Sequence, residues 1–262
     1  MDGITVVLCS WKSFPMLYTC VESLRANSLE NTNIKVVLNE YNRDSVNYLS
    51  DINIDFVACK DNRGTVAVDL LTPLLDSEYV VSINDDQIVN KGWDADLLNI
   101  YTDHYPCVPS VKCVEPEFTN NPMVIADNVG HILEILTRIK FEENCLNDKY
   151  KTHNLYGFNH PNLVRVSDWK KVGGYSCGLP YNFFGLGGYN NDDYFNYKLW
   201  KLYDEQLKFI VSGNSWVFHQ VSFSGKRLPP EIKNYDSHAK FVELTGITTK
   251  QFRDKLNWGQ AV

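Results

Sequence analysis

Two adjacent carboxylates, Asp85 and Asp86, follow a short apolar run at 79–83. The β-branched residues of this run predict a buried strand, which cannot hold two unpaired charges in its middle. At the carboxyl end of a strand the same side chains reach the crevice in which open α/β sheets bind ligands. Adjacent side chains on an extended segment point in opposite directions, so one could bind a metal ion and the other a hydroxyl. An isolated Asp-Asp pair is more often a polar turn, so the rest of the sequence must decide between a turn and a ligand site.

A second acidic pair, Asp192 and Asp193, follows two asparagines at the start of a predicted helix at 194–202. Acidic residues in a first turn suit the helix dipole, and Asn or Asp can cap its free amides. A carboxylate there could also act as a general base that deprotonates an acceptor hydroxyl. His219 ends a predicted strand and is either a structural histidine or a metal ligand. Carboxylates with one imidazole suit Mg²⁺ or Mn²⁺, and such a cation stabilises a nucleoside-diphosphate leaving group as a Lewis acid.

Alternating strands and helices must position these residues. The first part of the chain predicts strands at 4–9, 34–38, 56–59 and 79–83, with helices at 14–27, 45–49 and 65–75. This alternation predicts parallel pairing with right-handed crossovers. Polar residues end all four strands and should therefore meet at one edge of the sheet: Ser10-Trp11, Asn39-Glu40, Asp61-Asn62-Arg63 and Asp85-Asp86.

The later part predicts a helix after Gly92-Trp93 and a helix at 125–143. Further strands are expected at 108–114, 163–166, 209–211 and 216–218, and further helices at 237–244 and 248–256. The glycine-rich stretch 181–189 is expected to be a close-packed or mobile loop. Lys226 and Arg227 form either a solvated loop or a cationic flap over a diphosphate.

Composition limits the classes of protein. The chain has 262 residues, 44% of them hydrophobic, and a net charge of −7, which argues weakly against a nucleic-acid surface. No apolar stretch approaches the ~20 residues of a membrane span, and the first residues show no signal peptide. The seven cysteines are scattered, which predicts reduced thiols in a cytoplasmic protein. The histidines other than His219 are expected at the surface.

The sequence resembles the family 2 glycosyltransferases of the GT-A fold, well over residues 4–98 and more loosely over 164–223. The resemblance rests on the strand-turn-helix at 5–24, an Asp-x-Asp-type motif at Asn84-Asp85-Asp86, and Gly92-Trp93. Gly173-Gly174-Tyr175, Gly187-Gly188 and Asn191-Asp192-Asp193 are similar to the family's acceptor-side segment, which usually ends in Glu-Asp. Two positions depart from the pattern, because Asn84 carries no charge and Asn191 stands where Glu is usual.

The resemblance implies an α/β fold with one GT-A domain, in which helices flank a mixed, mainly parallel central sheet. Residues 1–225 would form this domain, with a nucleotide-sugar half at 1–98 and an acceptor-side half at 99–225. Residues 226–262 would form a small helical extension packed on it.

The resemblance also implies roles for individual residues. Cys9 and Trp11 would contact the nucleotide base, and Glu40 would bind the uracil. Asp61 and Arg63 would approach the base and diphosphate. Asn84 and Asp85 would lie at the donor, with Asp85 at the ribose or sugar. Asp86 and His219 would be metal ligands, and Asp192, or else Asp193, would be the catalytic base.

The implied activity is metal-dependent, inverting transfer of a sugar from a nucleotide-sugar, with UDP the expected nucleotide and Mn²⁺ or Mg²⁺ the cofactor. The acceptor stays open between a glycan, a lipid-linked sugar, a protein and, against the acidic charge, a modified nucleic acid. Rival hypotheses are a retaining transferase, a nucleotidyltransferase and a nucleotide-sugar-binding module without catalysis. Ser10-Trp11-Lys12-Ser13 lacks the Gly/Lys/Arg-rich phosphate loop that a nucleotidyltransferase would favour.

Overall fold

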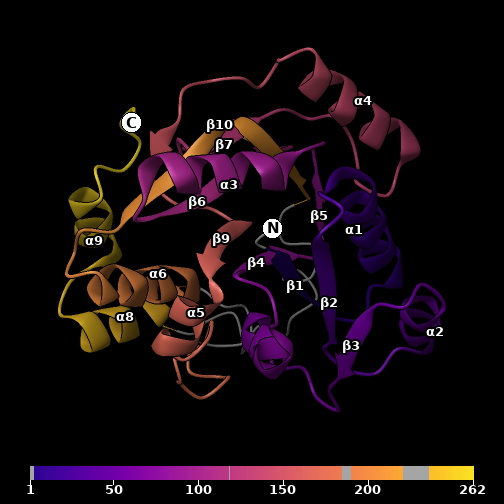
Figure 1. Ribbon diagram of the computed structural model, residues 1–262, viewed down its shortest axis with the longest axis horizontal. Coiled ribbons are helices and arrows are strands. Elements are labelled where there is room, and N and C mark those ends of the chain that lie inside the picture. The colour runs from indigo at the N-terminus through magenta and orange to yellow at the C-terminus, as the bar shows by residue number, and fades with distance from the viewer. Residues whose placement is uncertain (1–2, 118, 185–189, 221–235) are drawn as a thin grey trace.

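One mixed sheet runs through the centre of the protein. The computed structural model describes residues 3–117, 119–184, 190–220 and 236–262. Within these ranges ten strands form the sheet in the order β3-β2-β1-β4-β9-β6-β10-β5, with β7 beside β6 and β8 beside β10 (Figure 1). The strands are β1 Ile4–Ser10, β2 Thr32–Leu38, β3 Asp55–Ala58, β4 Tyr79–Asn84, β5 Gln87–Val89, β6 Cys107–Glu115, β7 Val124–Ala126, β8 Leu155–Tyr156, β9 Asn162–Arg165 and β10 Lys208–His219.

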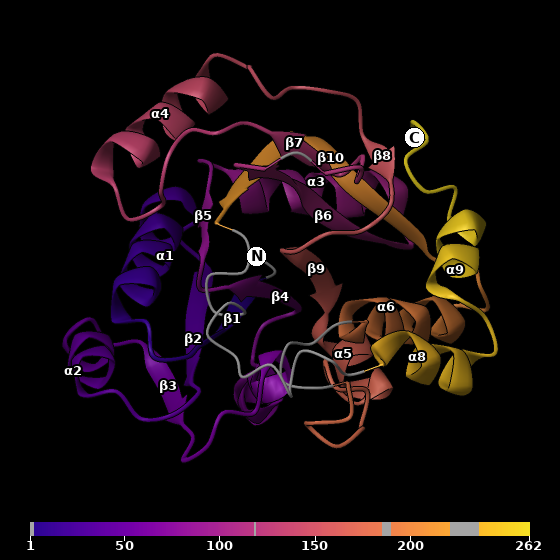
Figure 2. The same ribbon diagram turned by 180° about the vertical axis from the view of Figure 1, so that it is seen from behind.

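Helices cover both faces of the sheet. They are α1 Phe14–Asn27, α2 Arg43–Asp51, α3 Trp93–His104, α4 Ile135–Leu146, α5 Val166–Val172, α6 Asn191–Leu202, α8 Ser237–Thr245 and α9 Thr249–Lys255, with the 3-10 helix η1 at Thr65–Leu74. In Figure 2, α1 and α2 lie on one side of the molecule, and α5, α6, α8 and α9 gather on the other.

The first four strands form the expected parallel unit. β1 pairs in parallel with both β2 and β4, and β2 pairs in parallel with β3. Alternate residues of β1 enter different hydrophobic clusters, Val7 on one face and Val6 and Leu8 on the other. Burial on both faces explains why this strand reads as a continuous apolar run. The predicted α/β class and mainly parallel sheet are thus confirmed.

The second half of the sheet is mixed. β9 pairs antiparallel with β4, and β6 and β10 pair in parallel with each other. β5 follows the Asp85-Asp86 turn and pairs antiparallel with β10, which brings Gln87 opposite His219. The sequence did not predict β5, because three residues are too few to show a period.

One predicted helix was wrong, and two predicted strands are parts of a single strand. Residues 125–143 do not form one helix, because Val124–Ala126 is strand β7 beside β6 and α4 begins only at Ile135. Gly130, at a φ of +121°, lies in the connection, where its backbone conformation is incompatible with a continuing helix. The strands predicted at 209–211 and 216–218 are one strand, β10, whose register on β6 shifts between Val211 and Trp216.

The C-terminal helices share the core of the domain. Phe241 of α8 and Phe252 of α9 are fully buried and belong to the same hydrophobic cluster as Trp200 and Phe158. All seven cysteines are free thiols. Among the helices of the described ranges, none is long and apolar enough to cross a membrane.

Candidate active site

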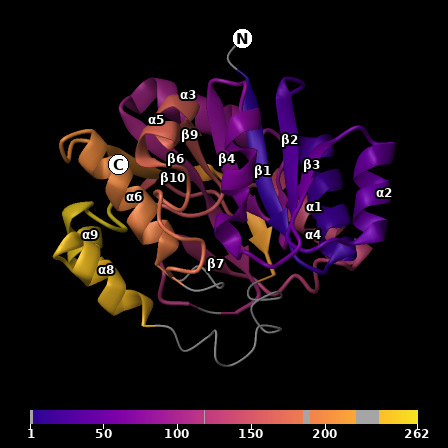
Figure 3. The same cartoon turned by 90° about the horizontal axis from the view of Figure 1, so that it is seen from below.

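The carboxyl ends of the four parallel strands meet at one edge of the sheet, seen side by side in Figure 3. The register places Ser10 beside Leu38, Cys9 beside Asn84, and Leu38 beside Ala58. The polar residues that follow these strands therefore lie close together, as strand polarity requires in a parallel sheet.

Asp85 and Asp86 lie in the turn between β4 and β5 and are both buried. The Ser10 hydroxyl donates a hydrogen bond to Asp85 Oδ2 at 2.6 Å. Asp86 Oδ1 lies 3.4 Å from His219 Nε2, so the two adjacent carboxylates contact different groups. Gln87 stabilises the turn by accepting from the Asn84 backbone N–H at 3.1 Å and donating to the His160 carbonyl at 3.3 Å. The acidic turn is thereby tied to the loop that precedes β9.

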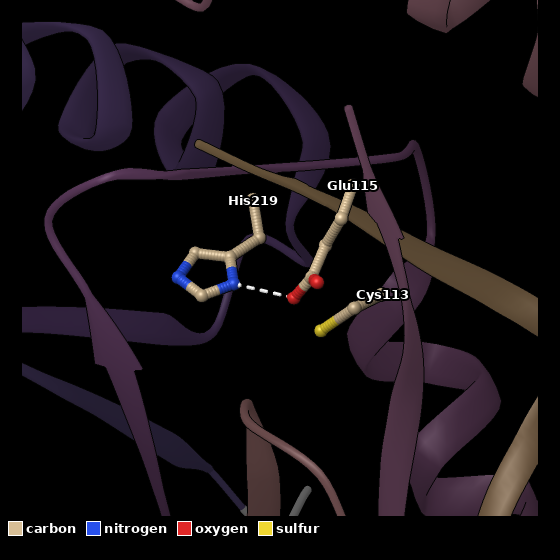
Figure 4. A group of neighbouring side chains, drawn as sticks. All are labelled: Cys113, Glu115 and His219. Carbon is tan, nitrogen blue, oxygen red and sulfur yellow. Dashed lines mark hydrogen bonds and ion pairs between the residues drawn. The ribbon is translucent and has the colours of Figure 1, made fainter. Parts of the chain in front are cut away.

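His219 lies between two carboxylates at the end of β10. Its Nδ1 is 2.9 Å from Glu115 Oε1, while its Nε2 faces Asp86. Cys113, Glu115 and His219 place their ligand atoms within 4.8 Å of one another (Figure 4). Burial alone would lower the pKa of His219, but Asp86 and Glu115 outweigh it and raise that pKa to about 10.

These donors fit a hard divalent cation. Two ligands of an octahedral ion with bonds of about 2.1 Å lie roughly 3 Å apart, near the 3.4 Å separation of Asp86 and His219. Burial raises the pKa of the Cys113 thiol well above its usual range, and a soft sulfur ligand suits Mg²⁺ and Mn²⁺ poorly. Carboxylate oxygens and one imidazole remain, a set that Mn²⁺ accepts.

The predicted donor residues Trp11, Glu40 and Arg63 lie along the same edge. Trp11 Nε1 is buried without a hydrogen-bond partner among the described residues, and an unpaired buried donor is unusual in a folded protein. Glu40 pairs with Lys12 at 2.7 Å. The Arg63 guanidinium lies 5.8 Å from the centre of the Tyr181 ring.

Asn39 builds the loop that carries Asp61 and Arg63. Its Nδ2 donates to the Asn62 side chain and to the Gly64 carbonyl, and its Oδ1 accepts from the Arg63 backbone N–H at 2.7 Å. Asp61 is exposed at the surface of this loop.

Cys9 lies at the base of the same loop. Its Sγ donates weakly to the Gly64 and Thr65 carbonyls, at 3.8 and 3.9 Å. Burial raises the pKa of the Cys9 thiol to about 12, so it packs as a neutral group.

Asp192 is held by two side chains, Tyr175 and His160, to which the sequence analysis gave no role in the site. The Tyr175 hydroxyl donates to Asp192 Oδ1, and His160 Nε2 lies 3.4 Å from Asp192 Oδ2. Desolvation would raise the pKa of Asp192, but His160 and these hydrogen bonds outweigh it and hold the pKa below its usual value. Burial alone would lower the pKa of His160, but the carboxylate of Asp192 outweighs burial and raises that pKa. The Asp192 side chain nevertheless stays 46% exposed.

Asp193 is buried and contacts Arg253 of α9. Arg253 Nη2 lies 3.0 and 3.2 Å from the two Asp193 oxygens, and Nε adds a third contact at 3.2 Å. Burial raises the pKa of Asp193 although Arg253 opposes the shift. A carboxylate clamped in this way is an anchor for α9, so Asp192 is the better placed of the two for proton transfer.

The turn that supplies Tyr175 is fixed by η1. Asp69 of η1 accepts from the backbone N–H groups of Tyr175 and Ser176. Gly174 has a φ of +75°, and a Cβ there would lie 2.5 Å from Asp69 Oδ1. Only glycine fits this turn, which explains part of the Gly-Gly-Tyr pattern.

Two adjoining cavities open around these groups, with volumes of about 350 and 340 Å³. Both are lined by five shared residues: Asn84, Asn121, Asn159, His160 and Asp192. The smaller cavity reaches Glu115 and His219, and the larger reaches Arg253 and Trp258. Asp192 therefore lies on the wall between the side of Glu115 and His219 and the C-terminal helices.

The prediction that His160 is a surface residue was wrong, because its side chain is 13% exposed and contacts Asp192. Sequence reasoning also missed Glu115, Tyr175 and Arg253 as site residues. Two of these residues carried a local signal in the sequence, since Glu115 adjoins a polar loop and Tyr175 follows two glycines. No local sequence pattern links Arg253 with Asp193. Gly185, Gly187, Gly188, Lys226 and Arg227 lie outside the described residues.

Comparison with known proteins gives the family. A family model described as "Glycosyl transferase family 2" matches residues 5–168. The chain belongs to glycosyl transferase family 2, as the resemblance implied. A search of curated proteins found no match.

Solved structures share the GT-A fold at low sequence identity. A structure of GalNAc-T7 with UDP, GalNAc and Mn²⁺ has a TM-score of 0.66 and 13% identity, covering 98% of this chain and 50% of that one. S. aureus TarS 1-349 in complex with UDP-GlcNAc has a TM-score of 0.61 and 10% identity, covering 97% of this chain and 70% of that one. The chain thus spans about half of the GalNAc-T7 chain, and the likeness establishes the fold alone.

Proposed function

We propose that the protein transfers a sugar from a UDP-sugar to an acceptor hydroxyl with inversion, using a divalent cation and Asp192 as general base. The observation that carries this proposal is the position of Asp192 between the two cavities. A base for single displacement must reach the acceptor hydroxyl on one side and face the donor sugar on the other. The structures of GalNAc-T7 with UDP and Mn²⁺ and of TarS with UDP-GlcNAc support the choice of donor and cation.

In this proposal the nucleotide lies along the edge of the parallel strands. Trp11 and Cys9 contact the base, with Trp11 Nε1 as an available donor, and Glu40 binds the uracil. Arg63 and Asp61 lie toward the base and diphosphate, and Asn84 and Asp85 toward the ribose and sugar. Ser10 orients Asp85 through their 2.6 Å hydrogen bond.

Asp86 and His219 would hold the cation, with Glu115 as an additional ligand or as the partner that orients the imidazole. When bound, Mn²⁺ or Mg²⁺ neutralises the charge that develops on the departing diphosphate. Binding requires His219 to lose its proton, because imidazole coordinates metal only as the neutral base.

Asp192 takes the proton of the acceptor hydroxyl as the acceptor oxygen bonds to the anomeric carbon. The bond between that carbon and the diphosphate oxygen breaks, and its electron pair leaves with the nucleoside diphosphate. Tyr175 and His160 keep Asp192 ionised and oriented before the transfer. We assign residues 1–98 to donor binding, 99–225 to the acceptor side and 226–262 to a C-terminal extension.

A thermal-shift screen of UDP-, GDP- and CMP-sugars, with and without Mn²⁺, tests the donor and the cation. UDP-sugars should raise the unfolding midpoint only with Mn²⁺, because a ligand bound to the folded state stabilises it by mass action. Bound UDP-sugars should then be slowly hydrolysed to UDP. Binding of nucleoside triphosphates with pyrophosphate release, or tight binding without any turnover, would contradict the proposal.

A further inference from the structure

The larger cavity, of about 350 Å³, lies beside Asp192 on the side away from His219 and Glu115. Two of its walls, Arg253 and Trp258, come from the C-terminal region beyond the family match at 5–168. Its volume is near the lower end of the roughly 300–1,000 Å³ range of small-molecule sites. It can therefore hold one or two rings of a ligand.

Carboxamides are unusually frequent in this cavity, which Asn84, Asn121, Asn159 and Asn190 line together. The Asn121 side chain accepts from the Met123 backbone N–H at 3.1 Å, and Asn190 accepts from the Ser237 hydroxyl at 2.8 Å. These bonds orient the amides. A carboxamide offers both donors and an acceptor, which matches a ligand with several hydroxyl groups.

The charged groups in the cavity are already compensated. Arg253 is bound to both oxygens of Asp193, and Asp192 faces His160 at 3.4 Å. An arginine that recognises phosphate or carboxylate uses the same two-pronged geometry that Arg253 gives to Asp193. The cavity is thus polar but close to neutral, which favours an uncharged ligand.

An aromatic pair completes the wall. Trp258 packs edge-to-face on the buried Phe158, with ring centres 4.9 Å apart, and the Arg253 guanidinium covers one face of its ring at 4.7 Å from the ring centre. Gly259 fixes the segment by donating to the Tyr156 carbonyl at 2.7 Å. Ligand sites combine such apolar surfaces with a few oriented polar groups. A sugar ring presents both, since its C–H groups suit an aromatic wall and its hydroxyls suit amides.

We propose that this cavity binds the acceptor as a neutral saccharide, with its ring against Trp258, its hydroxyls on the carboxamides and its reacting hydroxyl at Asp192. The inference rests on the proposed function for the reaction, but binding of the saccharide can be measured without turnover. The cavity would select a neutral glycan acceptor over an anionic sugar or a peptide hydroxyl.

Saturation-transfer NMR on the full chain with UDP and Mn²⁺ measures binding directly. Methyl glycosides of glucose, galactose and N-acetylglucosamine are compared with methyl glucuronide and a serine/threonine peptide. At least one neutral glycoside should show transfer, and the glucuronide and peptide should not. Absence of transfer for every neutral glycoside at about 50 mM, where even a Kd of ~10 mM is visible, would overturn the inference.

Paired variants locate the site. Trp258→Ala and Asn121→Ala should each weaken glycoside binding about 3- to 10-fold, the effect of losing roughly 1 kcal/mol of contact. The exposed Tyr105→Ala and Asn128→Ala are matched controls and should bind like the wild type. If Trp258→Ala does not fold, Trp258→Phe and Asn121→Ala carry the test. Binding that is unchanged in both folded variants would contradict the inference.

Turnover separates this inference from the proposed function. Neutral glycosides should accelerate UDP release from the UDP-sugar. Trp258→Ala and Asn121→Ala should raise the acceptor KM, whereas Tyr105→Ala and Asn128→Ala should leave it unchanged. If the donor is hydrolysed but only a peptide or an anionic sugar accelerates release, the saccharide inference fails and the proposed function stands. If glycosides bind but no nucleotide-sugar is turned over, the proposed function fails and the cavity assignment stands.

Discussion

Asp192 and Asp193 are adjacent and chemically identical, so replacing each with asparagine separates catalysis from structure. In Asp192→Asn the side chain keeps its size and can still accept from Tyr175, but it cannot take a proton. Loss of a general base lowers turnover by roughly 10²–10⁴-fold. Because the Asp192 side chain is 46% exposed, its ion pair with His160 contributes about 1 kcal/mol at most, and the unfolding midpoint should change little.

The opposite pattern is expected for Asp193→Asn. This side chain is 9% exposed and receives three contacts from Arg253. Weakening hydrogen bonds to a charged group costs about 1.5–3 kcal/mol. For a chain of this size, such a loss lowers the unfolding midpoint by roughly 3–12 °C. Turnover measured well below the midpoint should fall less than about tenfold, because the acceptor contacts Asp192.

The assay is UDP release under saturating donor and Mn²⁺, together with a thermal melt of each purified variant. Donor binding by calorimetry should be unchanged in both, which excludes an indirect loss of activity. If Asp193→Asn abolishes turnover while Asp192→Asn stays near wild type, the assignment of the base is refuted.

Three further changes test other parts of the structure. His160→Gln should lower the free energy of unfolding more near pH 6 than near pH 9. The pKa of His160 is raised in the folded state, so its stabilisation is present below the unfolded pKa of about 6.5 and is lost as the pH rises through the folded pKa. A difference in urea unfolding free energy between wild type and variant that grows with pH would contradict the pairing with Asp192. Glu115→Gln should weaken Mn²⁺ binding roughly 10- to 100-fold whether it is a ligand or orients His219, and an unchanged calorimetric affinity would exclude it from the site. Phe252→Ala should cost about 3–5 kcal/mol and lower the midpoint by roughly 6–20 °C, because the ring is fully buried; a melt within about 2 °C of wild type would show that α9 is not integral to the fold.

The sequence was informative where structure is local. The strands at 4–9 and 79–83 could be predicted because parallel strands buried on both faces are continuous β-branched runs. Strand direction alone then predicted that the polar residues after these strands lie at one edge of the sheet, which placed Asp85 and Asp86 there. The start of α6 followed from its acidic first turn.

The remaining parts of the fold and of the site depend on contacts between segments that are distant in the sequence. The helix expected at 125–143 failed because Val124 and Ile125 are better satisfied by pairing with β6 than by a helical turn. His160 reaches Asp192, and Arg253 reaches Asp193, only after β9 and α9 are packed in place. No spacing along the chain encodes such pairs, so the partners of both aspartates had to come from the structure.

The stereochemistry of transfer tests the central claim most directly. Proton NMR during the reaction of an α-linked UDP-sugar reports the anomeric configuration of the first product, before mutarotation if water is the acceptor. A single displacement assisted by Asp192 predicts a β-configured product from the α-linked donor, and this signal should disappear in Asp192→Asn. A first product with retained α-configuration would contradict the account.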